Sequence, residues 1–375
     1  MNETMTRREF VRSSAAAGAA LAALPLLPAR AAETNRAVLA LVGGAHSHTP
    51  GYVNLLKGRS DVTVKYVWDH QEARARQRAE DLQAPVTANL DTIWSDPEVV
   101  GVVICAETNR HAGLVTAAAK AKKHLFVEKP LGINGRESLA MARAVETAGL
   151  HFMTGYVMRT VPHYLFLKAQ IEQGAFGRIT RASAWTCHGG ALGGWFDPKP
   201  NDPANSWRWM ADPKVAGVGG FGDLGTHSLD ILMWLLGDVV SVSADIRVIT
   251  GRYGPACDEA GQGLLKFRNG VMGTLTAGWV DVANPVTLML SGTEGHAVVV
   301  QDKLYFKNAK VKGADGKEPW PDLPKATPAP MHQFVDAILG QPLRPLVTPS
   351  DAAARVVVMD ALYASNRRNR WVPVA

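Results

Sequence analysis

The sequence predicts an α/β protein in two parts: a parallel sheet with helices first, then an α+β part with an open, largely antiparallel sheet. Up to residue 150, short apolar runs alternate with helical patterns over short connections, which is typical of a parallel sheet. Beyond residue 178, β-branched and polar residues alternate between turn signals, which is typical of antiparallel strands with one packed face. The 375 residues, 47% of them hydrophobic, suffice for two cores.

Four buried strands and three helices are expected in the first part. The strands are predicted at residues 38–42, 62–69, 99–105 and 124–127, and the helices at residues 71–82, 111–121 and 138–148. A glycine turn at Gly43 and Gly44 ends the first strand, and the acid Asp69 ends the second. This combination is typical of a Rossmann dinucleotide-binding domain, which we place at residues 35–152.

The glycine loop departs from the usual G-x-G-x-x-G pattern. Gly43 keeps the first position, Ala45 occupies the second, and His48 stands in place of the third glycine. Ala45 is small enough for close backbone approach, and Ser47 and the loop amides are candidates to bind a pyrophosphate at a helix N-terminus. His46 and His48 are alternatively metal ligands, but no carboxylate stands near them in the sequence, and we predict no metal.

Asp69 is predicted to accept hydrogen bonds from ribose hydroxyls and to repel a 2′-phosphate, which favours NAD over NADP. His70, Arg74 and Arg76 follow it and could receive that phosphate, so NADP stays an alternative. A helix N-cap role for Asp69 is compatible with both cofactors.

An acid and an amine, Glu128 and Lys129, follow the fourth strand. Ligands of open parallel sheets bind at the carboxyl ends of the strands, so this pair is placed to meet one. Pro130 restricts Lys129 to an extended conformation, which fixes the direction of the amine. The alternative is a surface ion pair between Glu128 and Lys129.

The second domain is assigned to residues 153–375, with a role in substrate binding and self-association through its sheet. Its strands are expected at residues 178–185, 239–249, 263–267, 271–278, 286–291, 295–301 and 303–307. Residues 312–330, rich in Pro and Lys, predict a surface connection, and the last helix is expected at residues 350–366. Such a sheet can cover the reactive end of a dinucleotide held by the first domain.

A glycine-rich run at residues 217–225 leads into three polar residues at helical spacing. Asp223, His227 and Asp230 recur at i, i+4 and i+7, so they share one helix face. The spacing alone fits a solvated face as well as the wall of a cavity. The glycines before it favour the cavity, because glycine allows backbone to approach a ligand.

In order and spacing, these motifs resemble the glucose-fructose oxidoreductase, inositol dehydrogenase and rhizopine-catabolism (Gfo/Idh/MocA) superfamily. The matching segments are residues 108–111, 128–130, 155–159, 174–179, 222–230 and 370–372. The resemblance covers nearly all of the chain after the first 31 residues. It implies an NAD(P)-dependent oxidoreductase whose cofactor contacts include Thr108, Asn109, Glu128 and Lys129.

The same resemblance implies a catalytic set of Lys129, Asp223 and His227. Hydride transfer from an alcohol needs a base for the hydroxyl proton, and an imidazole such as that of His227 suits this role. Asp223 would orient the substrate or the imidazole, and Lys129 would hold the reacting oxygen. Tyr156 and Arg159 are candidates for substrate contacts.

Tryptophans cluster before the glycine-rich run, at Trp185, Trp195, Trp207 and Trp209. Aromatic faces stack on sugars and guanidinium groups bind hydroxyls, so Trp207 and Arg208 are predicted to contact a carbohydrate or cyclic polyol. The alternative is core packing for part of the set.

Residues 1–31 predict a twin-arginine export signal, with a basic start, an Ala/Leu-rich stretch and a small-x-small site ending at Ala31. The apolar stretch is too short to span a membrane as a mature helix. Because this route moves folded proteins, we expect a periplasmic or otherwise exported protein that carries tightly bound NAD(H) from the cytoplasm. The net charge of +6 is spread evenly, which argues against nucleic acid, and the three cysteines lack metal-binding spacing.

Two catalytic hypotheses and one without catalysis follow. The first is a sugar or cyclic-polyol oxidoreductase with bound nicotinamide. The second is a redox-neutral NAD-dependent glycosidase or lyase that works through a transient 3-keto sugar. The third is a sugar sensor that kept the fold, against which the retention of Lys129, Asp223 and His227 together argues.

Overall fold

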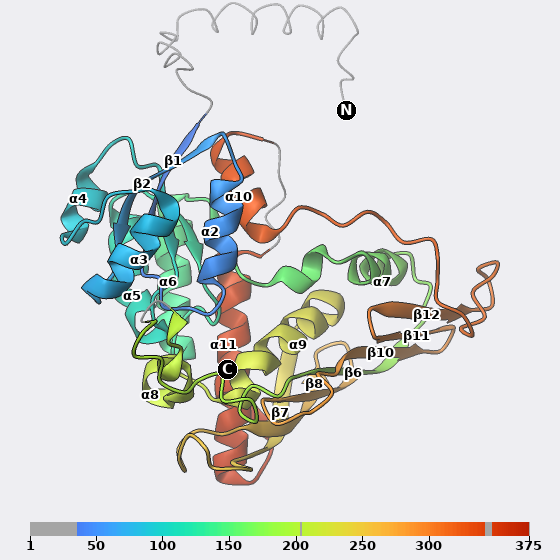
Figure 1. Cartoon of the computed structure of the whole chain (residues 1–375). Coiled ribbons are helices and arrows are strands. Elements are labelled where there is room, and N and C mark those ends of the chain that lie inside the picture. The colour runs from blue at the N-terminus through green and yellow to red at the C-terminus, as the bar shows by residue number, and fades with distance from the viewer. Residues whose placement is uncertain (1–35, 203–204, 342–346, 375) are drawn as a thin grey trace, which may run out of the picture. The chain divides into compact units, whose positions relative to one another are not determined.

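The structure is a computed structural model that describes residues 36–202, 205–341 and 347–374 (Figure 1). The predicted export signal lies outside these residues. From Arg36 onward the chain forms one compact unit with two sheets. A search of the described helices for a long, apolar membrane span finds none.

The first sheet has five strands in the order β2-β1-β3-β4-β5, all parallel. They are β1 (Ala37–Val42), β2 (Val62–Trp68), β3 (Gly101–Ile104), β4 (His124–Val127) and β5 (Phe152–Thr154). The connecting helices are α2 (Thr49–Lys57), α3 (Glu72–Leu82), α4 (Leu90–Ser95), η1 (Thr108–Arg110), α5 (His111–Lys120) and α6 (Gly135–Ala148). The predicted Rossmann domain is confirmed, with β5 as one strand more than expected.

The chain order of the strands reverses at β1, which lies between β2 and β3. In open α/β sheets this switch point is where the carboxyl ends of the strands form a ligand crevice. Gly43, Asp69, Glu107 and Glu128 follow the four strands β1 to β4 and therefore meet at one edge of the sheet.

The second sheet has eight strands in the order β12-β11-β10-β6-β9-β8-β7-β13. They are β6 (Ile179–Cys187), β7 (Val239–Arg247), β8 (Ala260–Phe267), β9 (Met272–Gly278), β10 (Val286–Gly292), β11 (Gly295–Val300), β12 (Lys303–Asn308) and β13 (Val372–Pro373). All neighbours are antiparallel except β6 and β9, so the prediction of a largely antiparallel sheet is confirmed.

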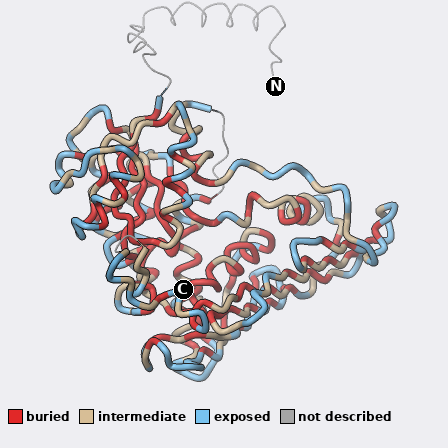
Figure 2. The backbone as a smooth tube through the Cα atoms, viewed as in Figure 1, coloured by how far each residue is buried: buried red, intermediate tan, exposed pale blue. Residues whose placement is uncertain are grey.

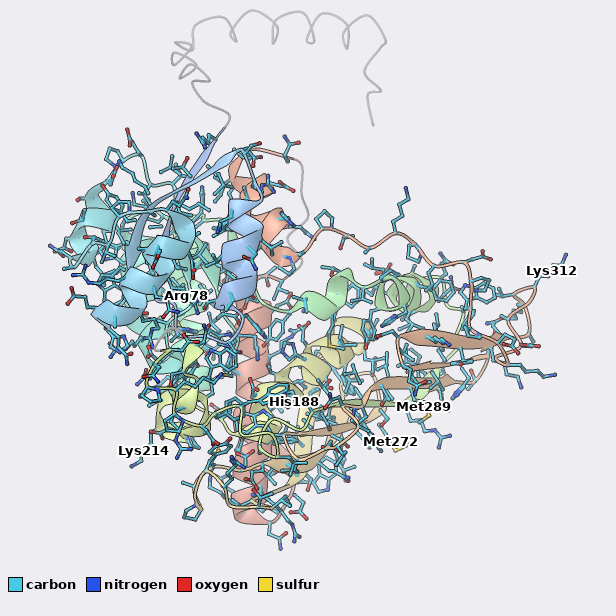
Figure 3. The ribbon with its side chains drawn as sticks, in the orientation of Figure 1. Arg78, His188, Lys214, Met272, Met289 and Lys312 are labelled. Carbon is cyan, nitrogen blue, oxygen red and sulfur yellow. The ribbon has the colours of Figure 1, made fainter. Side chains whose placement is uncertain are left out.

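Helices cover one face of this second sheet. The main one is α9 (Gly220–Leu236), which packs against β6, β8 and β9, and α7 (Pro162–Glu172) packs against α9. The short elements η2 (Val157–Thr160), η4 (Arg208–Ala211) and α8 (Pro213–Ala216) come before α9 in the chain, and α8 contacts η1 of the first domain. Burial alternates along β8 and β9, and Figure 2 shows buried and more exposed residues interspersed along the strands of this sheet. On the other face Leu264 and Met272 are 49% and 64% exposed, and Met272 is labelled with Met289 in Figure 3.

The last two helices, α10 (Pro330–Ile338) and α11 (Pro349–Arg368), pack against the first domain. Phe334 of α10 lies in one core cluster with Phe126 of β4, and Val356 of α11 lies in another with Val127. Farther along α11, Leu362 belongs to the core of the second domain. The long connection after β12 returns the chain to α10 (Figure 1). Assigning all residues after 152 to the second domain is therefore too simple.

Candidate active site

A buried ion pair joins the carboxyl end of β4 to the first turn of α9. Lys129 Nζ lies 2.8 Å from Asp223 Oδ1, and Trp279 Nε1 donates a 3.0 Å hydrogen bond to Asp223 Oδ2. Burial alone would raise the pKa of Asp223, but the Lys129 ammonium outweighs it and holds that pKa well below its usual range. Lys129 is thus held by an ionised carboxylate of the second domain. The alternative of a surface pair with Glu128 is wrong.

The glycines before α9 allow the helix to begin in contact with another backbone segment. A Cβ on Gly219 would lie 2.5 Å from Asp258 O, closer than two such atoms approach. Asp258 Oδ2 accepts a 2.9 Å hydrogen bond from the amide of Phe221, and Tyr363 OH donates to Asp258 Oδ1 at 2.9 Å. The glycines therefore position α9, and with it Asp223, rather than meeting a ligand themselves.

His227 lies one helical turn beyond Asp223 and is half-buried. Its imidazole has no hydrogen-bond partner among the described residues, and its ring centroid lies 6.0 Å from that of Tyr156 at an interplanar angle of 88°. Burial, then the charges of Lys129 and His48, lowers its pKa well below 6.5. At neutral pH the ring is uncharged and has a nitrogen free to take a proton.

Glu128 has no exposed surface and gathers donors from the glycine loop. Its carboxylate accepts hydrogen bonds from Tyr52 OH, from His48 Nδ1 at 3.0 Å and from the Lys129 amide at 2.8 Å. Burial would raise its pKa, but His46 and His48 outweigh burial and hold it well below its usual range. Glu128 therefore fixes α2 and the glycine loop to β4, and its contact with the cofactor stays a prediction.

The alternative metal site has its carboxylate after all, because Glu128 joins His46 and His48 with all three ligand atoms within 4.8 Å. The His48 amide donates to His46 Nδ1 at 3.2 Å, which assigns the imidazole proton to Nε2, 3.7 Å from Glu128 Oε2. A metal needs an unprotonated nitrogen there. Hydrogen bonding accounts for the cluster, so we do not assign it as a metal centre.

The glycine loop offers free backbone donors. Gly43 has φ +83°, and a Cβ there would lie 2.5 Å from that of Ala106, so the loop is held tightly against the residues after β3. Within the described chain the amides of Ala45 and Ser47 have no hydrogen-bond partner. Unpaired amides before a helix are suited to a phosphate group, so the loop fits the dinucleotide predicted for it.

Asp69 ends β2 as predicted, but its carboxylate is fully occupied. Gly44 N and Arg74 Nε donate to Oδ2 at 2.8 and 2.6 Å, and Gln71 N and Arg74 Nη2 donate to Oδ1 at 2.8 Å each. A carboxylate accepts about four hydrogen bonds. This departs from the prediction that Asp69 binds a ribose, because no acceptor site remains on it.

Arg159 and Asp230 form a buried structural network instead of a substrate contact. Arg159 Nε donates to Asp230 Oδ2 at 2.8 Å, and Arg355 Nε of α11 donates to Asp230 Oδ1 at 2.9 Å. The prediction that Arg159 contacts substrate is therefore wrong. Tyr156 is also buried, with its hydroxyl 2.7 Å from Thr226 Oγ1, so it packs behind His227.

The other predicted contacts lie in two places. Thr108 is buried and Asn109 exposed in η1, after β3. Trp207 caps η4 and Arg208 begins it, between β6 and α8, and the Trp207 ring is 4.3 Å from Lys199 Nζ. Arg208 lines a cavity beside Arg74, so the structure places it on the side of Asp69 and not with His227.

Sequence reasoning missed Trp279 and Tyr52, which hold Asp223 and Glu128. Tyr52 follows His48 by four residues, and His48 caps the helix that begins at Thr49, so helical spacing could have linked the two. Trp279 gave no such signal, because it reaches Asp223 only through the pairing of β9 in the second sheet.

The first domain has a Rossmann sheet and a loop with unpaired amides, and its Lys129 is ion-paired with Asp223 of the second domain. These features define the class of two-domain NAD-binding oxidoreductases. Residues 39–156 match the oxidoreductase family with NAD-binding Rossmann fold, and residues 164–298 match the GFO/IDH/MocA C-terminal domain. The chain belongs to the GFO/IDH/MocA family, as the resemblance implied, and its first domain is an NAD-binding domain.

Three proteins of known activity are similar to this chain in sequence. Levoglucosan dehydrogenase of Pseudarthrobacter phenanthrenivorans is 32% identical over 235 residues, 56% of this chain and 58% of that one. Myo-inositol 2-dehydrogenase of Thermotoga maritima is 30% identical over 226 residues, 59% of this chain and 62% of that one. The 2,7-anhydro-N-acetylneuraminate hydratase of Escherichia coli is 27% identical over 220 residues, 58% and 56% of the two chains. The chain thus matches less than two thirds of each relative.

The solved structures agree on the fold over a longer span. A levoglucosan dehydrogenase in complex with NADH and levoglucosan superposes with a TM-score of 0.74 and 25% identity, covering 90% of this chain and 99% of that one. The fold of both domains is therefore shared with an enzyme whose structure was solved in complex with NADH.

Proposed function

We propose that this protein is an NAD-dependent dehydrogenase that oxidises a secondary hydroxyl of a sugar or cyclic polyol. The observation that carries the proposal is the buried ion pair of Lys129 Nζ with Asp223 Oδ1, 2.8 Å apart. Asp223 shares a face of α9 with His227, whose imidazole is uncharged. The levoglucosan and inositol dehydrogenases among the relatives support this substrate class.

Each side chain has a distinct task in this reaction. Bound nicotinamide supplies the acceptor for the hydride that leaves the carbinol carbon. His227 takes the hydroxyl proton on a free ring nitrogen as the carbonyl forms. Lys129 donates a hydrogen bond to the reacting oxygen and stabilises its developing negative charge. Asp223 holds Lys129 in place through one carboxylate oxygen, and Trp279 Nε1 donates to the other.

A redox-neutral reaction on a glycoside or anhydro sugar is the second candidate. It is supported by the hydratase among the relatives and by the second group of acid and base side chains, His46, His48 and Glu128, close to Lys129. Such a reaction needs a proton acceptor for a C–H bond besides the one for the hydroxyl.

A panel of free sugars, cyclic polyols, anhydro sugars and glycosides, assayed on pure protein, separates the two candidates. Stoichiometric reduction of NAD⁺, read by absorbance, with formation of a keto sugar is expected for the dehydrogenase. Turnover of an anhydro sugar or glycoside without net change in NADH supports the second candidate. If the protein carries out neither reaction with any of these substrates, both candidate functions are overturned.

We also propose that the protein is exported and retains its NAD(H). The twin-arginine pattern at residues 7–8 supports export of the folded protein, and a compartment without free nicotinamide requires a retained cofactor. Denaturing the purified protein should release nicotinamide nucleotide into the supernatant. A supernatant without nucleotide contradicts tight retention.

Self-association through the second sheet is a further part of the proposal. Its support is the face that carries Trp185, Leu264 and Met272, all more than 40% exposed on the described chain. Light scattering after gel filtration should give a mass above that of one 40.3 kDa chain. Met272→Asp should lower it, whereas a monomeric wild type contradicts this proposal.

A further inference from the structure

A cavity of about 290 Å³ lies beside the ends of β2 and β3. Gln71, Arg74 and Glu107 form its floor from the first domain. Its roof comes from the loop between β6 and α8 and consists of Pro198, Lys199, Pro200, Ser206, Arg208 and Trp209. Its floor follows β2 and β3, which flank β1 in the sheet, at the positions where a Rossmann domain receives adenosine.

The roof is fastened to the first domain at three points. Trp209 Nε1 donates to Ala45 O of the glycine loop at 3.1 Å. Gln77 and Arg78 of α3 donate to Asp202 and Asn205 at 3.0 and 2.8 Å, and Arg78 is labelled at this edge of the domain in Figure 3. The cavity is therefore built from both domains.

Glu107 presents an unpaired acceptor at this cavity. Glu107 is 5% exposed, and its Oε1 accepts a 2.8 Å hydrogen bond from Arg74 Nη2. Oε2 is buried and has no hydrogen-bond partner among the described residues, with His70 Nδ1 and Arg110 Nε each 3.5 Å away. A buried carboxylate oxygen without a donor is costly unless a ligand supplies one.

The neighbouring charges leave Glu107 as the group able to accept from a ligand. Asp69 already accepts four hydrogen bonds, as described above, and Arg74 forms ion pairs with Asp69 and Glu107. Burial lowers the pKa of His70, so its ring is neutral near pH 7. The two basic roof residues lie on aromatic rings, Lys199 on Trp207 and Arg208 on Tyr253 at 4.3 and 5.0 Å.

We propose that Glu107, and not Asp69, binds the adenosine ribose hydroxyls of NAD and excludes the 2′-phosphate of NADP. A ribose hydroxyl supplies the donor that Oε2 lacks, whereas a phosphate would bring two negative charges against a buried carboxylate. Asp69 does not contact the ribose in this proposal, but it binds Arg74 and so holds that side chain against Glu107. The inference rests on NAD binding by the first domain and deepens the proposed function at its cofactor site.

The first test compares ligands on the unmutated full-length protein, freed of copurified nucleotide with charcoal. Calorimetry is carried out with NAD⁺, NADP⁺ and the NAD⁺ analogue that lacks the adenosine 2′-hydroxyl. A hydrogen bond to a charged group corresponds to a loss of about 10- to 100-fold in affinity for the deoxy analogue. NADP⁺ should bind still more weakly. Equal affinities for the three ligands overturn the inference.

The second test measures the NAD⁺/NADP⁺ affinity ratio of variants. Glu107→Gln keeps the acceptor for Arg74 but removes the charge, so the ratio should fall by about tenfold or more. Glu72→Gln makes the same change of charge on exposed α3 outside the cavity and should leave the ratio unaltered. Asp69→Asn should lower the melting temperature through Arg74 and change the ratio less than Glu107→Gln.

A ratio that follows Asp69→Asn and ignores Glu107→Gln overturns the inference and restores the ribose role to Asp69. If Glu107→Gln does not fold, Asp69→Asn alone still decides: an NAD⁺/NADP⁺ affinity ratio that collapses in Asp69→Asn overturns the inference, and a ratio that persists supports it. Failure of the proposed function is distinct: protein that binds NAD⁺ with this selectivity but oxidises no sugar or polyol refutes the substrate and leaves Glu107 as the ribose ligand.

Discussion

Replacing Lys129 with Met has two separable effects. Met keeps the length of the side chain but removes the cation 2.8 Å from Asp223. The chemical step loses a preorganised donor, a loss that typically costs about 10²- to 10³-fold in rate. The fold keeps a buried carboxylate that, within the described part of the chain, retains Trp279 as its donor, and breaking a buried pair from one side costs roughly 3–5 kcal/mol.

The double variant Lys129→Met with Asp223→Asn separates these effects. Asn removes the uncompensated charge and keeps an oxygen to accept from Trp279 Nε1, so most of the lost stability should return. The rate should stay low, because the donor to the reacting oxygen is still missing. The surface lysine Lys65, paired with Asp96, serves as control: Lys65→Met should cost under about 1 kcal/mol and leave the rate unchanged.

Single-turnover reduction of bound NAD⁺ measures the rate, and urea unfolding followed by circular dichroism measures stability. Bound nucleotide is quantified in each variant, so that a slow step is not confused with lost cofactor. Full activity of Lys129→Met with unaltered cofactor content would refute the role of Lys129. Recovery of the rate together with stability in the double variant would show that the lysine acts through the fold alone.

Three further outcomes are expected from other side chains. Because burial lowers the pKa of His227, the acidic limb of kcat/KM should lie below pH 6.5, and a limb at pH 7 or above contradicts a neutral base. Burial lowers the pKa of His46 to about 3, so only the unfolded chain takes up this proton below pH 6.5. Its contribution to stability is full above pH 6.5 and falls on acidification, by about 2 kcal/mol at pH 5, and His46→Asn should flatten this slope in urea titrations. Arg159→Met should cost on the order of 3 kcal/mol of stability with an unchanged KM, and the opposite pattern would return Arg159 to the substrate.

The alternation of apolar runs and helical patterns predicted the first sheet to within a few residues, because buried parallel strands are almost wholly apolar. β5 escaped prediction, since its three residues, Phe152–Thr154, are too few for a pattern. The part of α10 and α11 in the first core was also missed. Amphipathic helices show which face is buried but not which sheet they cover.

The site could be predicted as far as residue type and strand position determine it. The resemblance to the family put Lys129 and Asp223 in one set, and their ion pair confirms that the two side chains lie together. Charge pairing over long sequence distances could not be predicted. Arg74 is close to Asp69 in sequence, but nothing in the pattern shows that it saturates both carboxylate oxygens, and the pairing of Arg159 with Asp230 depends on the folded core.

The packing of α10 and α11 against the first sheet constrains when this chain can fold. Ribosomes release the N-terminal end first, and domains generally fold as units in that order. Here the ring of Phe334, in α10, lies 6.0 Å from that of Phe126, in β4, and is synthesised long after it. The nascent first domain therefore leaves the ribosome with an apolar face uncovered and completes its core only once α10 and α11 have been synthesised. A fragment cut between the domains keeps that face open to solvent and to aggregation, whereas the entire chain covers it with its own last helices.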